Sequence, residues 1–192
     1  MTCIVGVIGN KQVILAADSL ASMAHTKEEV LTPKLISLET AEIIDNHMLN
    51  PVKIGIGYTS SFRMGDILTY NFSPPKIQKN QPLTEYMVKE FIPELIDCFD
   101  KHSFTRSVNA VKEGGCFLVA IKERLFIVQT DFSVLEPTTG YSAVGSGSDL
   151  ALGSLHTSAM LIQDAKQAAE LAVKAASQFC TSVGGAVNLM VV

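Results

Sequence analysis

The fold class is decided near the N-terminus by Thr2-Cys-Ile-Val-Gly-Val-Ile-Gly9 and Val13-Ile-Leu-Ala-Ala-Asp18. Both stretches are rich in the β-branched residues that favour strands, and Asn10-Lys11 between them supplies turn-forming residues. The two stretches are close enough in the chain to pair directly. The sequence therefore predicts an antiparallel β-hairpin at its start.

Strands and helices are predicted to follow in groups. Apolar residues recur every four positions between residues 83 and 99, which predicts an amphipathic helix, and Pro93 predicts a kink or a break in it. The segment 39–50 is predicted as either an extended hairpin or a surface loop. The other predicted strands are 34–38, 52–58, 116–121, 125–129, 142–144 and 186–192, and the other predicted helices are 62–72, 150–159 and 165–179.

The order of these elements predicts an α+β protein. Helices are separated from consecutive strand pairs, which favours packed layers over alternating βαβ units. The chain has no internal repeat and no linker-like segment, so residues 1–192 are predicted to form one domain.

Composition excludes several classes of function. The 192 residues carry a formal charge of −4 and form no basic cluster, so nucleic-acid binding is not expected. No secretory signal and no apolar stretch long enough to span a membrane is recognisable. Four cysteines are widely spaced without a nearby histidine, which favours free thiols in a cytoplasmic protein. They are Cys3, Cys98, Cys116 and Cys180.

Three polar residues carry candidate chemistry: Thr2, Asp18 and Lys34. If Met1 is removed, the α-amino group of Thr2 can act as the base for its own hydroxyl. A neighbouring lysine would lower the pKa of the hydroxyl, and an aspartate would orient that lysine. Taken singly, each residue has a simpler interpretation. Thr2 could be an ordinary second residue, Asp18 could end a strand or make a turn, and Lys34 could be a solvated charge at a strand edge.

The spacing of the three residues resembles the proteasome β subunits and the bacterial peptidase HslV. In that family an acid follows the N-terminal threonine after 16 residues and a lysine follows it after 32, as Asp18 and Lys34 do here. The family's Gly-Ser-Gly loop, whose serine supports the N-terminal amine, is matched by Gly145-Ser146-Gly147. The resemblance covers nearly the whole chain. It implies the four-layer αββα sandwich of N-terminal nucleophile hydrolases.

The resemblance also implies an oxyanion donor and a cation site. The donor would be a backbone N–H of a glycine after the fourth strand, for which Gly57 fits best and Gly55 is the alternative. Backbone carbonyls would hold a monovalent cation, and no other cofactor is required. The equivalent carbonyls belong to Ser177, Cys180 and Val183.

Two features depart from the family pattern. Many proteasome β subunits carry an aspartate and a serine in the loop after the last helix, and neither is recognisable in residues 180–185, although HslV also lacks that aspartate. Many also carry a propeptide, whereas Met1 alone precedes Thr2 here. Removal of Met1 is therefore a condition for the predicted mechanism.

The leading functional prediction is a threonine-type endopeptidase that works in a homo-oligomeric ring. The resemblance implies unfolded polypeptide substrates, supplied by a partner ATPase. Two alternatives stay open: an amidase that acts on a small amide, and a non-catalytic ring subunit. Molecular mass in solution would identify the amidase, which need not form a ring. Thr2→Ala should abolish covalent labelling by an electrophile if Thr2 is the nucleophile, and should leave assembly unchanged.

Overall fold

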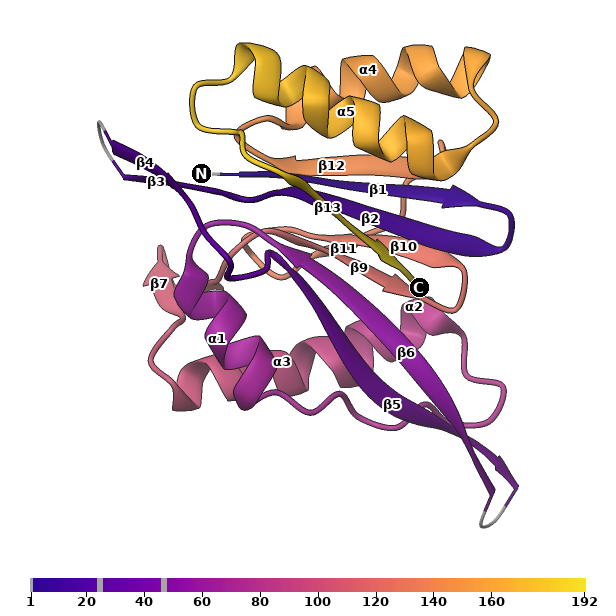
Figure 1. Cartoon of the computed structure of the whole chain (residues 1–192). Helices are drawn as coiled ribbons and strands as arrows, with labels where there is room; N and C mark the ends of the chain where they lie inside the picture. The colour runs from indigo at the N-terminus through magenta and orange to yellow at the C-terminus, as the bar shows by residue number, and fades with distance from the viewer. Residues whose placement is uncertain (1, 24–25, 46–47) are drawn as a thin grey trace.

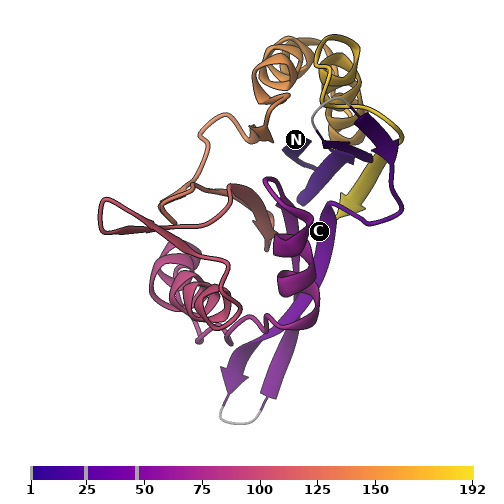
Figure 2. The same ribbon diagram turned by 90° about the vertical axis from the view of Figure 1, so that its left-hand side faces the viewer.

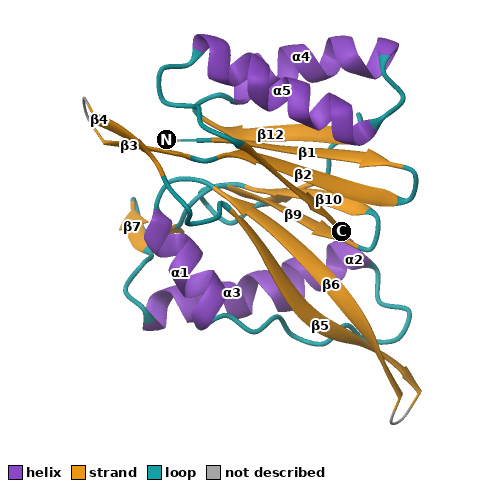
Figure 3. Ribbon diagram, in the orientation of Figure 1, coloured by secondary structure: helices purple, strands orange, loops and turns teal. Residues whose placement is uncertain are grey.

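The computed structural model describes residues 2–23, 26–45 and 48–192, which form four layers of helices and strands (Figure 1). Strands form two facing sheets, and helices cover the outer side of each (Figure 3). The first sheet has the order β12 (Tyr141–Gly145), β1 (Cys3–Gly9), β2 (Gln12–Asp18), β13 (Val187–Val191). The second has the order β11 (Val134–Leu135), β10 (Arg124–Val128), β9 (Phe117–Ile121), β6 (Met48–Tyr58), β5 (Leu35–Asp45).

Three hydrophobic clusters hold the four layers together, and Figure 2 gives the same stacking from the side. Between the sheets, Ile4 and Leu15 of the first pack near Leu118 and Leu125 of the second. Helices α4 (Ser148–Leu161) and α5 (Ala165–Phe179) cover the first sheet, to which they present mostly small alanines. Larger aromatic residues fill the layer beneath the second sheet. The predicted α+β, four-layer αββα sandwich is confirmed.

The N-terminal hairpin forms as predicted. β1 and β2 pair in antiparallel register from Ile4↔Ala17 to Gly9↔Gln12. Asn10 and Lys11 both have positive φ, 52° and 58°. Two consecutive left-handed residues are typical of the type I′ turn, whose twist matches that of the flanking strands.

The segment 39–50 adopts the first of its two predicted forms, an extended hairpin, although residues 46–47 lie outside the described residues. β5 and β6 pair from Leu35↔Gly57 outwards to Asp45↔Met48, and the hairpin projects from the body of the molecule (Figure 1). Ile77 covers part of the edge of β5, because its N–H donates to the Ala41 carbonyl and its carbonyl accepts the Ile43 N–H.

Pro93 neither breaks nor ends its helix. α2 (Leu83–Tyr86), η1 (Met87–Phe91) and α3 (Ile92–Lys101) follow one another without a gap, and η1 is a π-helical turn. A wider turn directly before a proline relieves the clash of its ring with the preceding carbonyls and absorbs the missing N–H. Helix α1 (Phe62–Tyr70) begins at the predicted residue, Phe62, and Ser61 is its N-cap.

Two short hairpins and a short strand were not expected. They are β3 (Leu20–Met23) with β4 (Thr26–Glu29), β7 (Arg106–Val108) with β8 (Val111–Glu113), and β11. These strands are two to four residues long, too short to show the apolar alternation that marks a half-buried strand. No helix in the described ranges is both long enough and apolar enough to cross a membrane.

Candidate active site

The pairing of β1 with its two neighbours brings the candidate residues to one end of the first sheet. Thr2 immediately precedes β1, and Asp18 is the last residue of β2. On the other side, Cys3 of β1 pairs with Gly145 of β12, so that Ser146 lies beside Thr2. Three residues far apart in the sequence are thus neighbours because of strand register alone.

Asp18 is the centre of the hydrogen-bond network. Its side chain is 1% exposed, and its Oδ1 accepts from the Thr2 hydroxyl at 2.9 Å and from the Cys3 N–H at 3.0 Å. Its Oδ2 accepts from the Gly184 N–H at 3.1 Å. One carboxylate therefore joins the N-terminal strand to the loop before β13.

Lys34 completes the arrangement from the second sheet. It directly precedes β5 and is 3% exposed, and its Nζ donates to Asp18 Oδ1 at 2.9 Å and to the Leu20 carbonyl at 2.8 Å. Burial lowers the pKa of Lys34, and the hydrogen bond to Asp18 partly opposes that shift. The pair places a buried positive charge close to the Thr2 hydroxyl, where it favours a developing alkoxide.

Ser146 lies at the Thr2 backbone. The Thr2 N–H donates to Ser146 Oγ at 3.2 Å, and Ser146 Oγ donates to the Thr2 carbonyl at 3.3 Å. The preceding Gly145 has a φ of 100°, and a Cβ on it would lie 2.3 Å from the Thr2 carbonyl oxygen. Glycine is required at residue 145 because a side chain there would push the strands apart.

Ser182 is a member of this network that sequence reasoning missed. Its side chain is 5% exposed, and its hydroxyl lies 2.9 Å from Ser146 Oγ and 3.2 Å from Cys180 Sγ. The hydrogen bond from Ser182 lowers the pKa of Cys180. A serine in the loop after the last helix was the available signal, but the path of that loop could not be read from the sequence.

The structure does not bring Gly57 or Gly55 to the cavity. Both lie inside β6, and a Cβ on Gly57 would lie 2.3 Å from Cγ2 of Ile4 in the core between the sheets. The Thr59 N–H donates to Cys116 next to β9, and alternation along the ladder turns the N–H of Gly57 towards β9 as well. The glycine allows the two sheets to approach closely.

Ser60, just beyond β6, has the free donor that the glycines lack. It has a φ of 73°, and its N–H donates to no acceptor in the described ranges. Its neighbours differ, since the Ser61 N–H donates to the Thr59 carbonyl at 2.9 Å. Sequence reasoning missed Ser60 because the resemblance implied a glycine as the donor, and Ser60 is not one.

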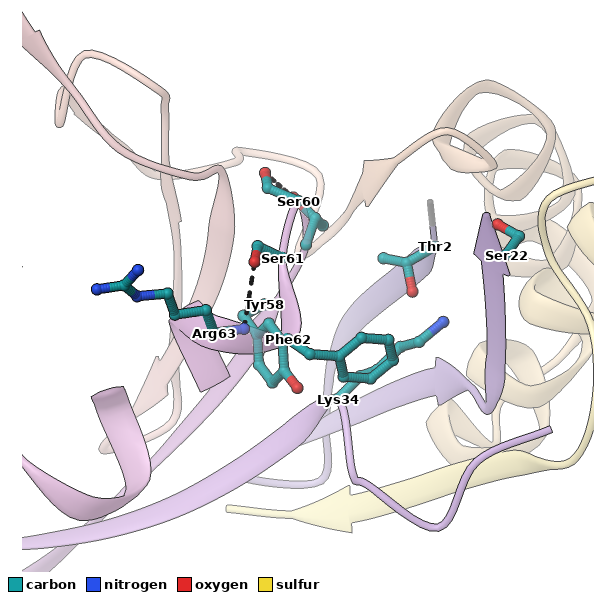
Figure 4. A pocket seen from close by; sticks show the side chains of 9 residues that line it. Thr2, Ser22, Lys34, Tyr58, Ser60, Ser61, Phe62 and Arg63 are labelled. Atoms are coloured by element: carbon teal, nitrogen blue, oxygen red, sulfur yellow. Dashed lines mark hydrogen bonds between the residues drawn. The ribbon is translucent and has the colours of Figure 1, made fainter. Parts of the chain in front are cut away.

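A cavity of about 440 Å³ opens beside Thr2. Figure 4 shows Thr2, Ser22 and Lys34 on one side, and Ser60 and Ser61 on the other. Tyr58, Thr59, Phe62 and Arg63 complete the lining. The cavity has room for a side chain of a bound substrate, with the Thr2 hydroxyl at its wall.

The three residues predicted to hold a cation lie close together in the chain. Ser177 is in the last turn of α5, Cys180 follows the helix, and the Cys180 carbonyl already accepts the Val183 N–H at 3.1 Å. The described residues contain no group of three or more His, Cys, Asp or Glu side chains that could hold a metal ion. A carbonyl-bound monovalent cation stays a prediction.

Comparison with known proteins relies on structure, because neither a protein-family model nor a curated protein matches the sequence. BPH from Thiobacillus denitrificans is 20% identical with a TM-score of 0.72, and the match covers 99% of this chain and 97% of BPH. A further structure of BPH contains epoxomicin.

Two other similar structures belong to HslV and Anbu. HslV from Trypanosoma brucei is 18% identical with a TM-score of 0.60, and the match covers 98% of each chain. Anbu from Pseudomonas aeruginosa, described as a helical assembly, is 11% identical with a TM-score of 0.65, over 99% of this chain and 80% of Anbu. The chain therefore has the fold of the HslV-like, proteasome-type N-terminal nucleophile hydrolases.

Proposed function

We propose that the protein is a threonine-type amide hydrolase, specifically an endopeptidase, with Thr2 as its nucleophile after removal of Met1. The observation that carries the proposal is the buried contact of the Thr2 hydroxyl and the Lys34 ammonium with one oxygen of Asp18. A buried lysine–aspartate pair costs desolvation energy, so it is weak evidence for a role in stability alone. Lys34 and Thr2 line a cavity, which supports a chemical role for the pair.

In the proposed mechanism, the Thr2 oxygen attacks the carbonyl carbon of a peptide bond. The hydroxyl proton passes to the free α-amine of Thr2, and the charge of Lys34 stabilises the oxygen as the proton leaves. The N–H of Ser60 is the proposed donor to the oxyanion that forms on the substrate. The C–N bond then breaks, the leaving amine takes the proton, and water hydrolyses the ester left on Thr2.

Cys3 is a poor alternative nucleophile. It is 0% exposed, and burial followed by the charge of Asp18 raises the pKa of its thiol to about 12. Thiolate, and not thiol, is the reactive form of cysteine. Thr2, at 4% exposure, lines the cavity, whereas Cys3 does not.

Assembly into a homo-oligomer is part of the proposal. The likeness to HslV and to the helical Anbu complex supports it. Enclosed threonines would act on unfolded polypeptides supplied by a partner ATPase. The mass of the particle in solution tests the assembly, because a monomer of 20.7 kDa would contradict it.

Epoxomicin, bound in a structure of BPH, is the probe for the nucleophile. We expect intact mass to show loss of Met1 and, after incubation, the addition of one inhibitor at Thr2. Thr2→Ala should abolish the adduct, and Thr2→Ser, the matched control, should retain it. Absence of labelling in the unsubstituted protein lacking Met1 would favour the non-catalytic subunit. Labelling without cleavage of unfolded polypeptides would favour the small-amide hydrolase.

A further inference from the structure

We propose that Glu29 is a positioning residue for this reaction, which keeps the two acceptors of the Lys34 ammonium in place by holding Ser19 between them. The inference rests on the function proposed above. Glu29 lies on β4, whose residues are all exposed, and neither its spacing from Thr2 nor the likeness to solved structures assigns it a role. The hairpin of β3 and β4 projects from the end of the first sheet where the N-terminus lies (Figure 1).

One oxygen of Glu29 joins two segments of the chain. Its Oε1 accepts from the Ser19 hydroxyl at 2.7 Å and from the Ala186 N–H at 2.7 Å. Ser19 directly follows β2 and is 4% exposed, whereas Ala186 belongs to the loop before β13. The Ser19 bond, followed by the Ala186 bond, lowers the pKa of Glu29. The ionised carboxylate is therefore the form that holds the two segments together.

Ser19 lies between the two residues that accept hydrogen bonds from Lys34. The Lys34 Nζ donates to Asp18 Oδ1 at 2.9 Å and to the Leu20 carbonyl at 2.8 Å. A displacement of Ser19 would therefore move both acceptors, one on each side of it in the chain. The ammonium that they hold is the charge placed close to the Thr2 hydroxyl, so its position affects the reaction directly.

The loop before β13 gives Glu29 a second connection with the site. The Gly184 N–H donates to Asp18 Oδ2 at 3.1 Å, and the Gly184 carbonyl accepts the Ser19 N–H at 3.2 Å. Gly185 follows with a φ of 74°, and a Cβ on it would lie 2.3 Å from Ser19 Oγ. Asp18 and Glu29 thus hold the loop on either side of Gly185, where glycine leaves the backbone free to rotate.

Loss of the Glu29 carboxylate would leave the buried Ser19 hydroxyl without its acceptor. Ser19 would turn towards a new partner and shift the backbone on either side of it. The Lys34 ammonium would move with its two acceptors. Attack by the Thr2 hydroxyl would then slow, because the positive charge would no longer lie where the alkoxide forms. Glu29 does not line the cavity, so initial binding should change little.

Glu28 provides a matched control. It precedes Glu29 on the same strand, carries the same charge and is also exposed, but its side chain points to the opposite face of the hairpin. Glu28→Ala therefore repeats the loss of charge and of side chain without the loss of the two bonds. Glu29→Gln is the conservative variant, because an amide oxygen can accept both hydrogen bonds.

The test measures labelling by epoxomicin at neutral pH, well below the thermal midpoint of every variant, in protein that lacks Met1. It separates the initial binding constant from the rate of bond formation. We expect Glu29→Ala to slow bond formation about tenfold, less than the roughly hundredfold cost of a displaced reacting group, with initial binding unchanged. Glu29→Gln should stay within about threefold of the unsubstituted protein, and Glu28→Ala should match it.

Hydrogen exchange of the loop before β13 gives a readout that does not depend on labelling. The N–H groups of Gly184 and Ala186 should exchange faster in Glu29→Ala, whereas those of β9, in the middle of the second sheet, should exchange as before. A general loss of stability would instead raise exchange in both places.

An unchanged rate of bond formation in Glu29→Ala, or unchanged exchange of the loop, would overturn the role of Glu29. Slower labelling caused only by weaker binding would do the same. An equal loss in Glu28→Ala, or no recovery in Glu29→Gln, would also overturn it, because the charge of the hairpin and not the pair of bonds would then be the cause. If Glu29→Ala does not fold, Ser19→Ala replaces it, since it removes one of the two bonds from the other side and should slow bond formation in the same way.

These outcomes are separate from failure of the proposed function. Absence of labelling in the unsubstituted protein lacking Met1 overturns both proposals. Normal labelling of that protein and of Glu29→Ala overturns the positioning role alone.

Discussion

Replacement of Asp18 by asparagine should cost the protein much of its stability. The substitution leaves Lys34, which is 3% exposed, as a buried cation without its counter-charge. Removal of one partner of a buried ion pair typically costs about 3–5 kcal/mol. The new amide group would also face the Gly184 N–H, so that two donors oppose each other in place of the present 3.1 Å bond.

The expected loss is large enough to measure by two methods. For a chain of 192 residues, about 3–5 kcal/mol corresponds to a fall in thermal midpoint of roughly 6–20 °C. Urea titration at fixed protein concentration should give the same loss in free energy of unfolding. Fixed concentration matters because self-association contributes to apparent stability.

Two further variants identify the buried charge as the cause. Glu85→Gln breaks the exposed pair with Lys89 and should change the free energy of unfolding by less than about 0.5 kcal/mol. Lys34→Met combined with Asp18→Asn removes both charges and should recover at least half of the loss caused by Asp18→Asn. The reasoning is refuted if Asp18→Asn costs less than about 1 kcal/mol, or if the double variant is no more stable than Asp18→Asn alone.

Two more predictions concern the sheets and the loop before β13. Gly57→Ala should lower the free energy of unfolding by about 1–3 kcal/mol, because its Cβ would lie 2.3 Å from Ile4 Cγ2 in a packed core; an unchanged urea midpoint would contradict this. Glu29 accepts from the Ser19 hydroxyl and the Ala186 N–H, and the Ser19 bond is the main cause of its lowered pKa. Its ionised form is thus favoured in the folded protein, so its stabilisation is present above the unfolded pKa and is lost as pH falls through the folded pKa. Glu29→Gln should therefore lower the thermal midpoint at pH 7, and the difference should shrink as pH falls through the lowered pKa of Glu29; a constant difference would show that Glu29 acts without its charge.

Local patterns predicted the fold well where burial and turn chemistry agreed. Strand-forming residues on both sides of Asn10-Lys11 were sufficient for the first hairpin. The β3–β4 hairpin was missed because Thr26-Lys-Glu-Glu29 is exposed throughout and shows no alternation. The π-helical turn before Pro93 was missed because either a kink or a wider turn resolves the same steric clash, and the sequence does not distinguish them.

The candidate site could be predicted only where spacing along paired strands determined it. Thr2, Asp18, Lys34 and Ser146 are linked by strand register and by the ends of neighbouring strands, and the structure brings all four together. Ser60 and Ser182 depend on the course of loops. The glycine prediction at residue 57 relied on residue type, whereas the available N–H belongs to a serine with positive φ.

The contacts of Asp18 and Ser146 have a consequence for the time at which the site can form during synthesis. Asp18 meets Gly184 across 166 positions of sequence, and Thr2 meets Ser146 across 144. Contacts between such distant residues form late, since the intervening chain must be ordered first. A growing chain on the ribosome therefore carries Thr2 long before it contains Ser146 and Gly184. The order of synthesis would delay any reaction at Thr2 until these residues have emerged and the chain can fold around them.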